Sequence, residues 1–215
     1  MTSDQATVYV VDDDPSVRAS IDRLFRSIGH AVLTFETTQS FLAEAQRLGP
    51  GCLILDVRLP NVSGLEFQRE LATQGVGVPI VFITGHGDIP MSVAAMKAGA
   101  IEFLTKPFRD QDLIDAVHRG LERDRVQREG ARTLEIVRQR FASLTPREQE
   151  VMSRVVAGLM NKQIAGELQL SEVTVKVHRA QVMRKMGVKT LPDLVRIADR
   201  VGANTIKPQT DYPTV

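Results

Sequence analysis

Five short apolar runs alternate with helix-length segments along the first 120 residues of the chain. The runs are rich in β-branched residues and several are apolar throughout, which is typical of strands buried on both faces of a parallel sheet. The segments between them carry apolar residues at helical spacing. This alternation predicts an α/β fold with a doubly wound, five-stranded parallel sheet. The predicted strands are Val8–Val11, Ala31–Phe35, Cys52–Leu55, Ile80–Ile83 and Glu102–Thr105.

Beyond residue 110 the pattern becomes purely helical. The chain contains no proline from there to residue 141, and apolar residues keep helical spacing on both sides of a polar stretch. We therefore expect the last helix of a first domain, 5–120, to continue into a charged helical linker, 121–141. Gly120 and Gly130 leave open a break in this helix.

A second domain, made of four helices only, is predicted at 142–202, and a flexible tail at 203–215. Its start carries the pattern of a capping box with proline in the first helical position. The expected caps are Thr145 (with Pro146 and Glu148), Asn161 before a helix at 162–169, and Ser171 before a helix that ends at Met186; the last helix is expected at Leu191–Val201.

Composition and charge narrow the function classes. No stretch approaches the eighteen or more apolar residues that suggest a membrane span, and the N-terminus lacks a signal-peptide pattern. We therefore expect a cytoplasmic protein with no membrane partner. Cys52 is the only cysteine, which excludes an intrachain disulfide and a metal site built from several cysteines. Residues 1–120 hold 10 basic and 15 acidic residues, whereas 142–202 hold 10 and 6, which indicates an acidic module joined to one that binds nucleic acid.

Carboxylates follow two of the predicted strands. Asp12 and Asp13 come directly after the first strand, and Asp56 ends the third. In open α/β sheets, ligands bind at the carboxyl ends of the strands near the point where the strand order reverses. If these strands are neighbours, the three carboxylates converge and need a cation, and ligands that are all oxygen suit Mg²⁺. Asp14 precedes Pro15 and is expected to cap a helix rather than to bind the metal.

A hydroxyl and an ammonium group reach the same edge of the predicted sheet. Thr84 ends the fourth strand, and Lys106 follows the fifth. A carboxylate nucleophile surrounded by these groups and Mg²⁺ makes a site for phosphoryl transfer, because the cations neutralise the phosphoryl oxygens.

Four motifs in this order and spacing, VVDDDP, LILDVRLP, FITGHGD and FLTKPF, resemble the receiver domain of bacterial two-component response regulators, and GHGDIPMSVAAMKAGA is most similar to the FixJ branch. The resemblance covers about 5–120 and implies that a sensor histidine kinase phosphorylates Asp56. It also implies that Thr84 and Lys106 hold the phosphoryl oxygens and that Phe103 is the aromatic switch residue, although Phe103 also fits plain core packing. The implied Mg²⁺ ligands are Asp13, Asp56 and the backbone carbonyl of Arg58, with Asp12 acting through water.

The segment LTPREQEVMSRVVAGLMNKQIAGELQLSEVTVKVHRAQVMRKMGV, within about 142–202, resembles the helix-turn-helix domain of LuxR/NarL-type regulators. The resemblance implies double-stranded promoter DNA as a partner. Relatives carry lysine at the position of Ala180, so their target sequence does not transfer to this chain. The expected DNA contacts are Lys176, Val177 and Ala180 on bases and Lys162, Arg179 and Arg184 on phosphates, with Thr174 matching the family pattern on the same helix.

The spacing of residues along 171–186 supports a DNA-binding helix independently. At 100° per residue, one apolar stripe is expected in the core, and the opposite face is short, basic and free of acidic residues, as a helix in a major groove needs. A merely solvated basic face is the alternative. The core stripe consists of Val175, His178, Val182 and Met186, and the opposite face of Lys176, Arg179, Ala180 and Met183.

We therefore predict a transcription regulator, not an enzyme, whose phosphorylation favours a homodimer and promoter binding, with RNA polymerase as a further partner. One alternative is a metal-dependent phosphatase with an aspartyl nucleophile, although such enzymes carry an acid two residues after the nucleophile, where Arg58 stands. Another is a DNA-binding protein that works without phosphorylation, and the intact acid cluster argues against it. His30 and His118 are expected to be ordinary helix or loop residues.

Overall fold

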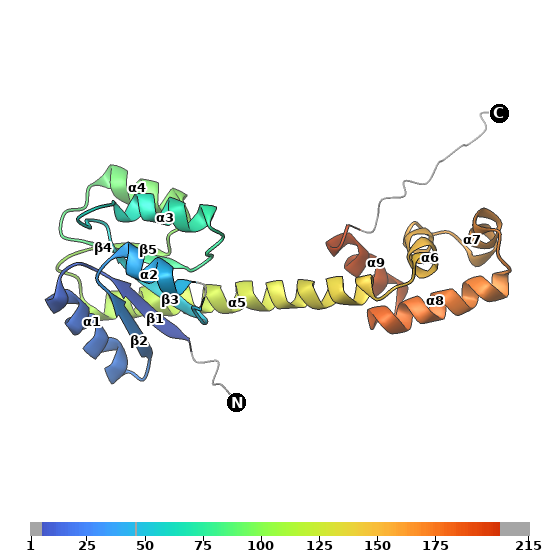
Figure 1. Cartoon of the computed structure of the whole chain (residues 1–215), viewed down its shortest axis with the longest axis horizontal. Helices are drawn as coiled ribbons and strands as arrows, with labels where there is room; N and C mark the ends of the chain where they lie inside the picture. The colour runs from blue at the N-terminus through green and yellow to red at the C-terminus, as the bar shows by residue number, and fades with distance from the viewer. Residues whose placement is uncertain (1–5, 46, 203–215) are drawn as a thin grey trace. The chain divides into compact units, whose positions relative to one another are not determined.

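The computed structural model describes residues 6–45 and 47–202 (Figure 1). These residues form two compact units that divide after Arg128. The predicted flexible tail, 203–215, lies outside the described residues. Among the helices in the described segments, none combines the length and the apolar character needed to cross a membrane.

The first unit is built on five strands: β1 (Thr7–Val11), β2 (Ala31–Phe35), β3 (Gly51–Asp56), β4 (Ile80–Thr84) and β5 (Glu102–Thr105). All pairs are parallel and the order is β2-β1-β3-β4-β5, so the predicted doubly wound sheet is confirmed. Val11 pairs with Phe35 on one side and with Leu55 on the other. The strand order therefore reverses at β1, and the carboxyl ends of β1 and β3 lie side by side at this switch point.

Five helices belong to this sheet: α1 (Pro15–Ser27), α2 (Thr38–Ala45), α3 (Gly64–Thr73), α4 (Ile89–Lys97) and α5 (Asp110–Ala142). They cover both faces (Figure 1). On one face, Phe25 of α1 and Leu113 of α5 pack against the strands. On the other, Phe41 of α2, Phe67 of α3 and Ala95 of α4 fill the core. Burial on both faces explains why the strands are apolar throughout.

Capping groups fix the start of α1 beside the end of β1. The carboxylate of Asp14 accepts hydrogen bonds from the amides of Ser16 and Val17, at 2.7 and 3.4 Å, and Pro15 takes the first helical position. Asp14 is therefore the N-cap of α1, as predicted. Its carboxylate is bonded to the start of the helix, so it does not join the acids that follow β1 and end β3.

The helix α5 continues without a break for 33 residues. The two glycines do not interrupt it, so the break that the sequence left open does not occur. At Gly120 a Cβ atom would lie 2.4 Å from the Sγ atom of Cys52 in β3. Glycine is therefore required here, because it lets the helix approach the sheet closely, and that packing outweighs its low helix propensity.

The polar part of α5 is attached to the first unit by a buried carboxylate. Asp124 is only 2% exposed and accepts a hydrogen bond from the amide of Gly51 at 2.9 Å. Arg128 donates to the same carboxylate at 2.8 Å and to the carbonyl oxygen of Gly49 at 2.9 Å. These bonds tie α5 to the segment that enters β3, so the start of the predicted linker belongs to the sheet unit.

This attachment predicts a stability effect. In Asp124→Asn, the side chain keeps an acceptor for the Gly51 amide but loses the ion pair with Arg128. We therefore expect the free energy of unfolding of the first unit to fall by about 1 kcal/mol. Urea unfolding followed by circular dichroism measures this change. Asp115→Asn is the matched control, because Asp115 lies on the same helix, is exposed and bonds only to Gln111 among the described residues. Equal midpoints for the two variants would contradict the anchoring role.

The second unit contains α6 (Pro146–Val156), α7 (Asn161–Leu168), α8 (Glu172–Met186) and α9 (Leu191–Arg200), which confirms the four predicted helices. The capping box before α6 is also confirmed: the hydroxyl of Thr145 accepts from the Glu148 amide, and the Glu148 carboxylate accepts from the Thr145 amide. Lys185 of α8 binds the Glu148 carboxylate at 2.6 Å, which joins the start of α6 to the end of α8.

The prediction that Asn161 caps α7 is wrong. The helix begins at Asn161 itself, and Met160 is the N-cap, with its amide donating to the side chain of Gln163 at 2.8 Å. The side-chain oxygen of Asn161 instead accepts a hydrogen bond from Arg179 of α8 at 3.1 Å. Asn161 therefore connects two helices of this unit rather than starting one.

The end of α5 contributes to the core of the second unit. Val137 is buried there, Phe141 packs against the same core, and Arg140 donates to the carbonyl oxygen of Met186 at 3.1 Å. The segment predicted as a linker, 121–141, is thus attached at both ends, because its first part is anchored to the sheet unit and its last part to the helical unit.

Candidate functional site

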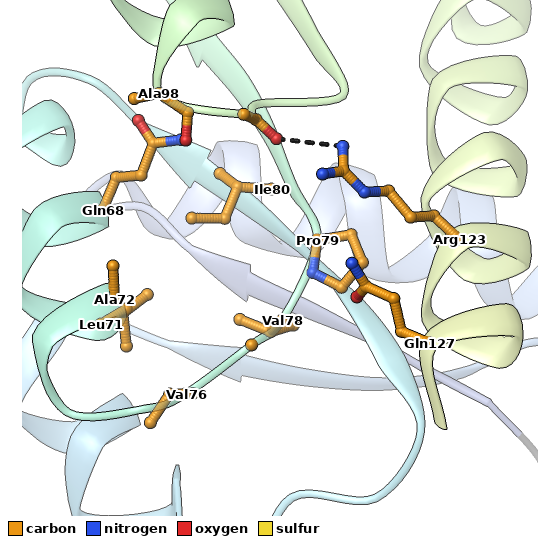
Figure 2. Close-up of a pocket in the computed structure, with 12 residues that line it drawn as sticks. Gln68, Leu71, Ala72, Val76, Val78, Pro79, Ile80, Ala98, Arg123 and Gln127 are labelled. Atoms are coloured by element: carbon orange, nitrogen blue, oxygen red, sulfur yellow. Dashed lines mark hydrogen bonds between the residues drawn. The ribbon is translucent and has the colours of Figure 1, made fainter. Parts of the chain in front are cut away.

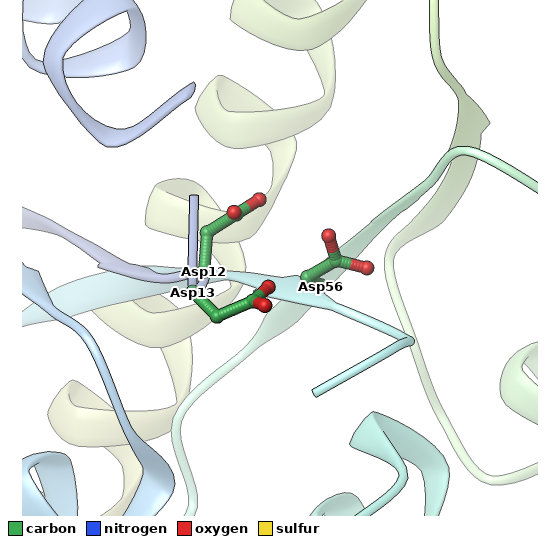
Figure 3. Close-up of side chains that lie close together, drawn as sticks. All are labelled: Asp12, Asp13 and Asp56. Atoms are coloured by element: carbon green, nitrogen blue, oxygen red, sulfur yellow. The ribbon is translucent and has the colours of Figure 1, made fainter. Parts of the chain in front are cut away.

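Three carboxylates gather where β1 and β3 end (Figure 3). Oxygen atoms of Asp12, Asp13 and Asp56 lie within 4.8 Å of one another. Asp12 and Asp56 are 0% and 6% exposed, whereas Asp13 is exposed to solvent. The convergence predicted from the sequence follows directly from the pairing of the two strands. Burying two like charges beside a third is unfavourable unless cations neutralise them.

Lys106 supplies one such cation. Its Nζ atom lies 2.7 Å from Oδ2 of Asp12 and 2.6 Å from Oδ2 of Asp56. Burial would lower the pKa of Lys106, but its hydrogen bonds to the two carboxylates and their charges outweigh that effect and raise it. Burial raises the pKa of Asp12 above the usual aspartate value, although the hydrogen bond from Lys106 opposes this. One ammonium group does not balance three carboxylates, so the donor set fits a divalent cation bound by oxygen ligands.

Backbone groups orient the buried pair. The amide of Asp14 donates to Oδ1 of Asp12, and the amide of Arg58 donates to Oδ1 of Asp56, both at 2.9 Å. Each carboxylate therefore has one oxygen on a backbone amide and the other on Lys106. The amide of Arg58 lies against Asp56, while its side chain is exposed.

Two further residues position the acids, and neither was predicted. Arg18, one turn into α1, donates to the carbonyl oxygen of Asp12 at 2.6 Å. Gly64 begins α3 so close to Asp56 that a Cβ atom would lie 2.5 Å from the Asp56 carbonyl oxygen. A glycine shortly after a strand that ends in aspartate was a visible signal for the second contact, whereas nothing in the spacing of Arg18 marked the first.

Thr84 lies at the same edge of the sheet but faces the following loop. It is fully buried, and its hydroxyl accepts from the amide of His86 and donates to its carbonyl oxygen, each at 3.3 Å. Phe103 is half-buried and packs against Phe82 with ring centroids 6.2 Å apart. A Cβ atom at Gly87 would come within 2.8 Å of the Phe103 ring, so the loop leaves just enough room for that ring.

A different hollow, of about 190 Å³, lies at the opposite edge of the sheet, where β4 begins (Figure 2). Its described lining is mostly apolar and includes Val76, Val78 and Pro79. Arg123 donates to the Gly99 carbonyl oxygen there at 3.2 Å. No carboxylate, histidine or cysteine is among the described lining residues, so this hollow lacks the groups that the acid cluster brings together.

In the second unit, α8 presents an accessible face. Lys176, Val177 and Ala180 are exposed, and so are Lys162 and Arg184. Within the described segments, the ammonium groups of Lys176 and Lys162 make no hydrogen bond or ion pair with another residue. These lysines are therefore free to meet an external partner.

Three predicted DNA contacts are partly occupied, and one of them is Arg184, which donates to the side-chain oxygen of Gln181. Arg179 is half-buried and donates to Asn161, and Thr174 is half-buried with its hydroxyl 2.8 Å from that of Ser171, the N-cap of α8. Sequence reasoning missed Val173, which is exposed one turn before Val177 and extends the face toward the start of the helix. The spacing of four residues between these valines was the available signal.

The core stripe of α8 is confirmed in part. Val175, Val182 and Met186 are buried as predicted. His178 is only half-buried, so its assignment to the core is only partly right. Met183, predicted on the opposite face, packs against the core, so that face is narrower than the spacing indicated.

Comparison with known proteins agrees with both units. Residues 8–118 match the family described as "Response regulator receiver domain", and residues 142–198 match "Bacterial regulatory proteins, luxR family". The transcriptional regulatory protein FixJ of Rhizobium meliloti is 44% identical over 192 residues, which cover 89% of this chain and 94% of FixJ. The chain belongs to the NarL/FixJ family of response regulators.

Other relatives match this chain along most of its length. Nodulation protein W of Bradyrhizobium diazoefficiens is 52% identical over 200 residues, covering 93% of this chain and 88% of that protein. The solved structure of the response regulator StyR has a TM-score of 0.83 at 51% identity, over 91% of this chain and 99% of StyR. This NarL/FixJ response regulator is thus a two-component transcription regulator and not an enzyme, with a receiver domain and a LuxR-type DNA-binding domain.

Proposed function

We propose that Asp56 accepts a phosphoryl group from a partner histidine kinase in a reaction that requires Mg²⁺. The observation that carries this proposal is the ammonium group of Lys106, 2.6 Å from Asp56, within a cluster of three carboxylates. The carboxylate of Asp56 attacks phosphorus, the bond from phosphorus to the kinase histidine breaks, and the histidine leaves with its electron pair. Lys106 balances charge on the phosphoryl oxygens as this transfer proceeds.

The acid cluster would hold the metal ion. Asp13, Asp56 and the backbone carbonyl of Arg58 are the proposed Mg²⁺ ligands, and Asp12 acts through water. When bound, Mg²⁺ neutralises charge on the phosphoryl oxygens and on the crowded acids. The exposed position of Asp13 supports this role, because Mg²⁺ keeps several of its waters and needs a site open to solvent.

Phosphorylation would shift a pre-existing equilibrium between two conformations of the receiver domain. The phosphoryl group adds nearly two negative charges next to Lys106. The hydroxyl of Thr84, now bonded to the backbone of His86, would turn to a phosphoryl oxygen, and Phe103 would move inward into the vacated space. The backbone of Gly87 runs so close to the Phe103 ring that a Cβ atom there would lie 2.8 Å from it, which supports a link between the two movements.

The surface of α4 supports dimerisation as the outcome of this switch. Ile89, Val93 and Met96 are exposed apolar residues at positions i, i+4 and i+7, so they form one stripe along the helix. The helix follows the loop that carries His86 and Gly87, so a change at Thr84 reaches it directly. We propose that this stripe, together with the neighbouring surface of β5, forms the contact between two phosphorylated receiver domains.

This predicts a change of mass on phosphorylation. The full chain should sediment mainly as a monomer alone and shift toward a dimer with acetyl phosphate and Mg²⁺, because burial of the α4 stripe is favoured only in the phosphorylated state. Asp56→Asn serves as the control and should stay monomeric under both conditions. Analytical ultracentrifugation that gives one mass for the native chain in both states would refute phosphorylation-dependent assembly.

The helical domain is proposed to bind promoter DNA in the cytoplasm and to act on transcription by RNA polymerase. In the dimer, two copies of α8 would enter major grooves of a site with two-fold symmetry. Lys176, Val177 and Ala180 would meet base edges, and Lys162 and Arg184 phosphates. Arg179, oriented by Asn161, would reach a further phosphate. Thr174 would lie at the same surface, near the start of the helix.

Selection of bound DNA from a random pool tests the whole proposal. The chain is incubated with the pool in the presence and absence of acetyl phosphate and Mg²⁺, and the bound DNA is sequenced. Enrichment of one site with two-fold symmetry, stronger with the phosphodonor, is expected. Equal enrichment in both conditions would show that DNA binding does not depend on phosphorylation, and no enrichment would rule out sequence-specific binding.

A further inference from the structure

Two of the four histidines meet on the surface of the receiver domain. The Nε2 atoms of His30 and His118 lie 3.3 Å apart, although 88 residues separate them in the sequence. His30 stands directly before β2, and His118 is in α5. The strands are parallel, so His30 lies at the edge of the sheet where they begin. The acid cluster lies at the other edge, where they end.

The spacing of the two nitrogen atoms is that of neighbouring ligands in a tetrahedral metal site. Metal–nitrogen bonds to histidine in zinc sites are about 2.0–2.1 Å, which places two such nitrogens about 3.3–3.4 Å apart at a tetrahedral angle. The ring planes are inclined by 54°, so the two rings are not stacked face to face. A hydrogen bond between one protonated and one unprotonated nitrogen gives a similar distance, so experiment must separate the two arrangements.

The surroundings hold the ring of His30 in place and favour its neutral form. Phe25 packs against the ring of His30 edge to face, with centroids 6.1 Å apart. Burial lowers the pKa of His30, and the neighbouring His118 lowers it further, which favours the neutral ring that binds metal. His118 is exposed, which leaves the pair open to an ion from solvent.

Charged side chains beside His118 form hydrogen bonds with other residues. Arg119 donates to Glu102 at 2.9 Å, Glu122 is bound by Arg125, and Asp115 accepts from Gln111. The described part of the chain groups no third histidine, cysteine or carboxylate closely with the pair. Two histidines therefore define the site, and water would complete the coordination.

We propose that His30 and His118 bind a divalent transition metal ion of the Zn²⁺ class, which links the connection before β2 to α5. Two imidazole nitrogens suit zinc, copper and nickel, whereas Mg²⁺ prefers oxygen ligands, so this site and the acid cluster take different ions. Because the ion binds only when both histidines are brought together, it also stabilises the folded receiver domain.

Calorimetric titration of Zn²⁺ into the full chain without a histidine tag tests the site. Excess Mg²⁺ is present so that the acid cluster does not compete for zinc. We expect one Zn²⁺ per chain. His30→Gln and His118→Gln should each weaken zinc binding by about tenfold or more. The double variant should bind zinc with the same affinity as either single variant, because one histidine alone is a poor ligand set. The matched control is His86→Gln, which removes a histidine close to the acid cluster and should leave zinc binding unchanged.

Two further measurements, of stability and of Co²⁺ absorption, test the same site. Zn²⁺ should raise the urea midpoint of the native receiver domain but not of the two variants, whose midpoints without metal show whether they fold. Co²⁺ should give visible absorption bands that are lost in both variants. Zinc affinity that is equal in His30→Gln and the native chain, or that falls only in His86→Gln, would overturn the proposal. Absence of binding to the native chain would also overturn it and leave the pair as a hydrogen bond only.

Discussion

The Asp56→Asn variant should take up no phosphoryl group from acetyl phosphate and Mg²⁺, whereas the native chain should take up one. Asparagine has nearly the same size as aspartate but lacks the carboxylate that attacks phosphorus. The native Asp56 oxygen lies 2.6 Å from Lys106 and its partner oxygen 2.9 Å from the Arg58 amide, so the group is held in place for this reaction. The expected effect is therefore complete loss rather than slower uptake.

Mass spectrometry of the intact chain measures this uptake, and two controls sharpen it. Asp14→Asn should still be labelled, because asparagine is an equally good N-cap and the Asp14 side chain faces α1 rather than the acid cluster. Removal of Mg²⁺ with a chelator should stop labelling of the native chain. Uptake by Asp56→Asn at the native level would move the phosphoacceptor to another residue and refute the proposed role.

The acid cluster could be predicted because its members stand at the ends of buried strands. Once the apolar runs are identified as parallel strands, the order of the sheet brings Asp12, Asp13 and Asp56 to one edge. The hydroxyl of Thr84 could not be placed in the same way. The direction of this hydroxyl depends on the loop after β4, where the backbone of His86 binds it. No periodic sequence pattern predicts the path of a loop.

Contacts between distant segments explain most of what the sequence did not reveal. The stretch around Asp124 has the composition of a solvated helix, and its burial depends on Gly51, 73 residues away. The pairing of His30 and His118 likewise arises only when α5 packs beside the start of β2. Local patterns predict where an element begins and which face is apolar, but they do not reveal which polar residue finds a partner across the fold.

The errors in the helical domain have a related cause. Asn161 is a residue type that favours N-caps, yet its side chain binds Arg179, because the backbone of Met160 is already satisfied by Gln163. Met183 packs against the core because, at 100° per residue, it lies only about 60° from Met186, at the margin of the core stripe. The prediction grouped Met183 with the exposed residues, although it borders the one buried face of α8.

The exposed face of α8 is narrower than predicted, and Lys176 lies on it. Lys176→Ala should weaken binding to the selected site by about 1–3 kcal/mol and relax the preference for a base at one position in each half-site. Lys176 is exposed next to Val177, and within the described segments its ammonium group has no hydrogen-bond partner, so it is free to donate to a base edge. A lysine that reads a base adds affinity only where the right base is present.

Lys162→Ala should behave differently, which makes the two variants controls for each other. Lys162 is exposed near the start of α7, outside the recognition helix, and is expected to hold a phosphate. Its removal should weaken binding to all sequences alike and reduce the slope of log affinity against log salt by about one unit for each phosphate that is no longer neutralised. Titration of both variants against the selected site and scrambled DNA at several salt concentrations separates these outcomes. If Lys176→Ala weakens binding to both DNAs equally, its base-reading role is wrong, and Lys176 binds a phosphate as Lys162 does.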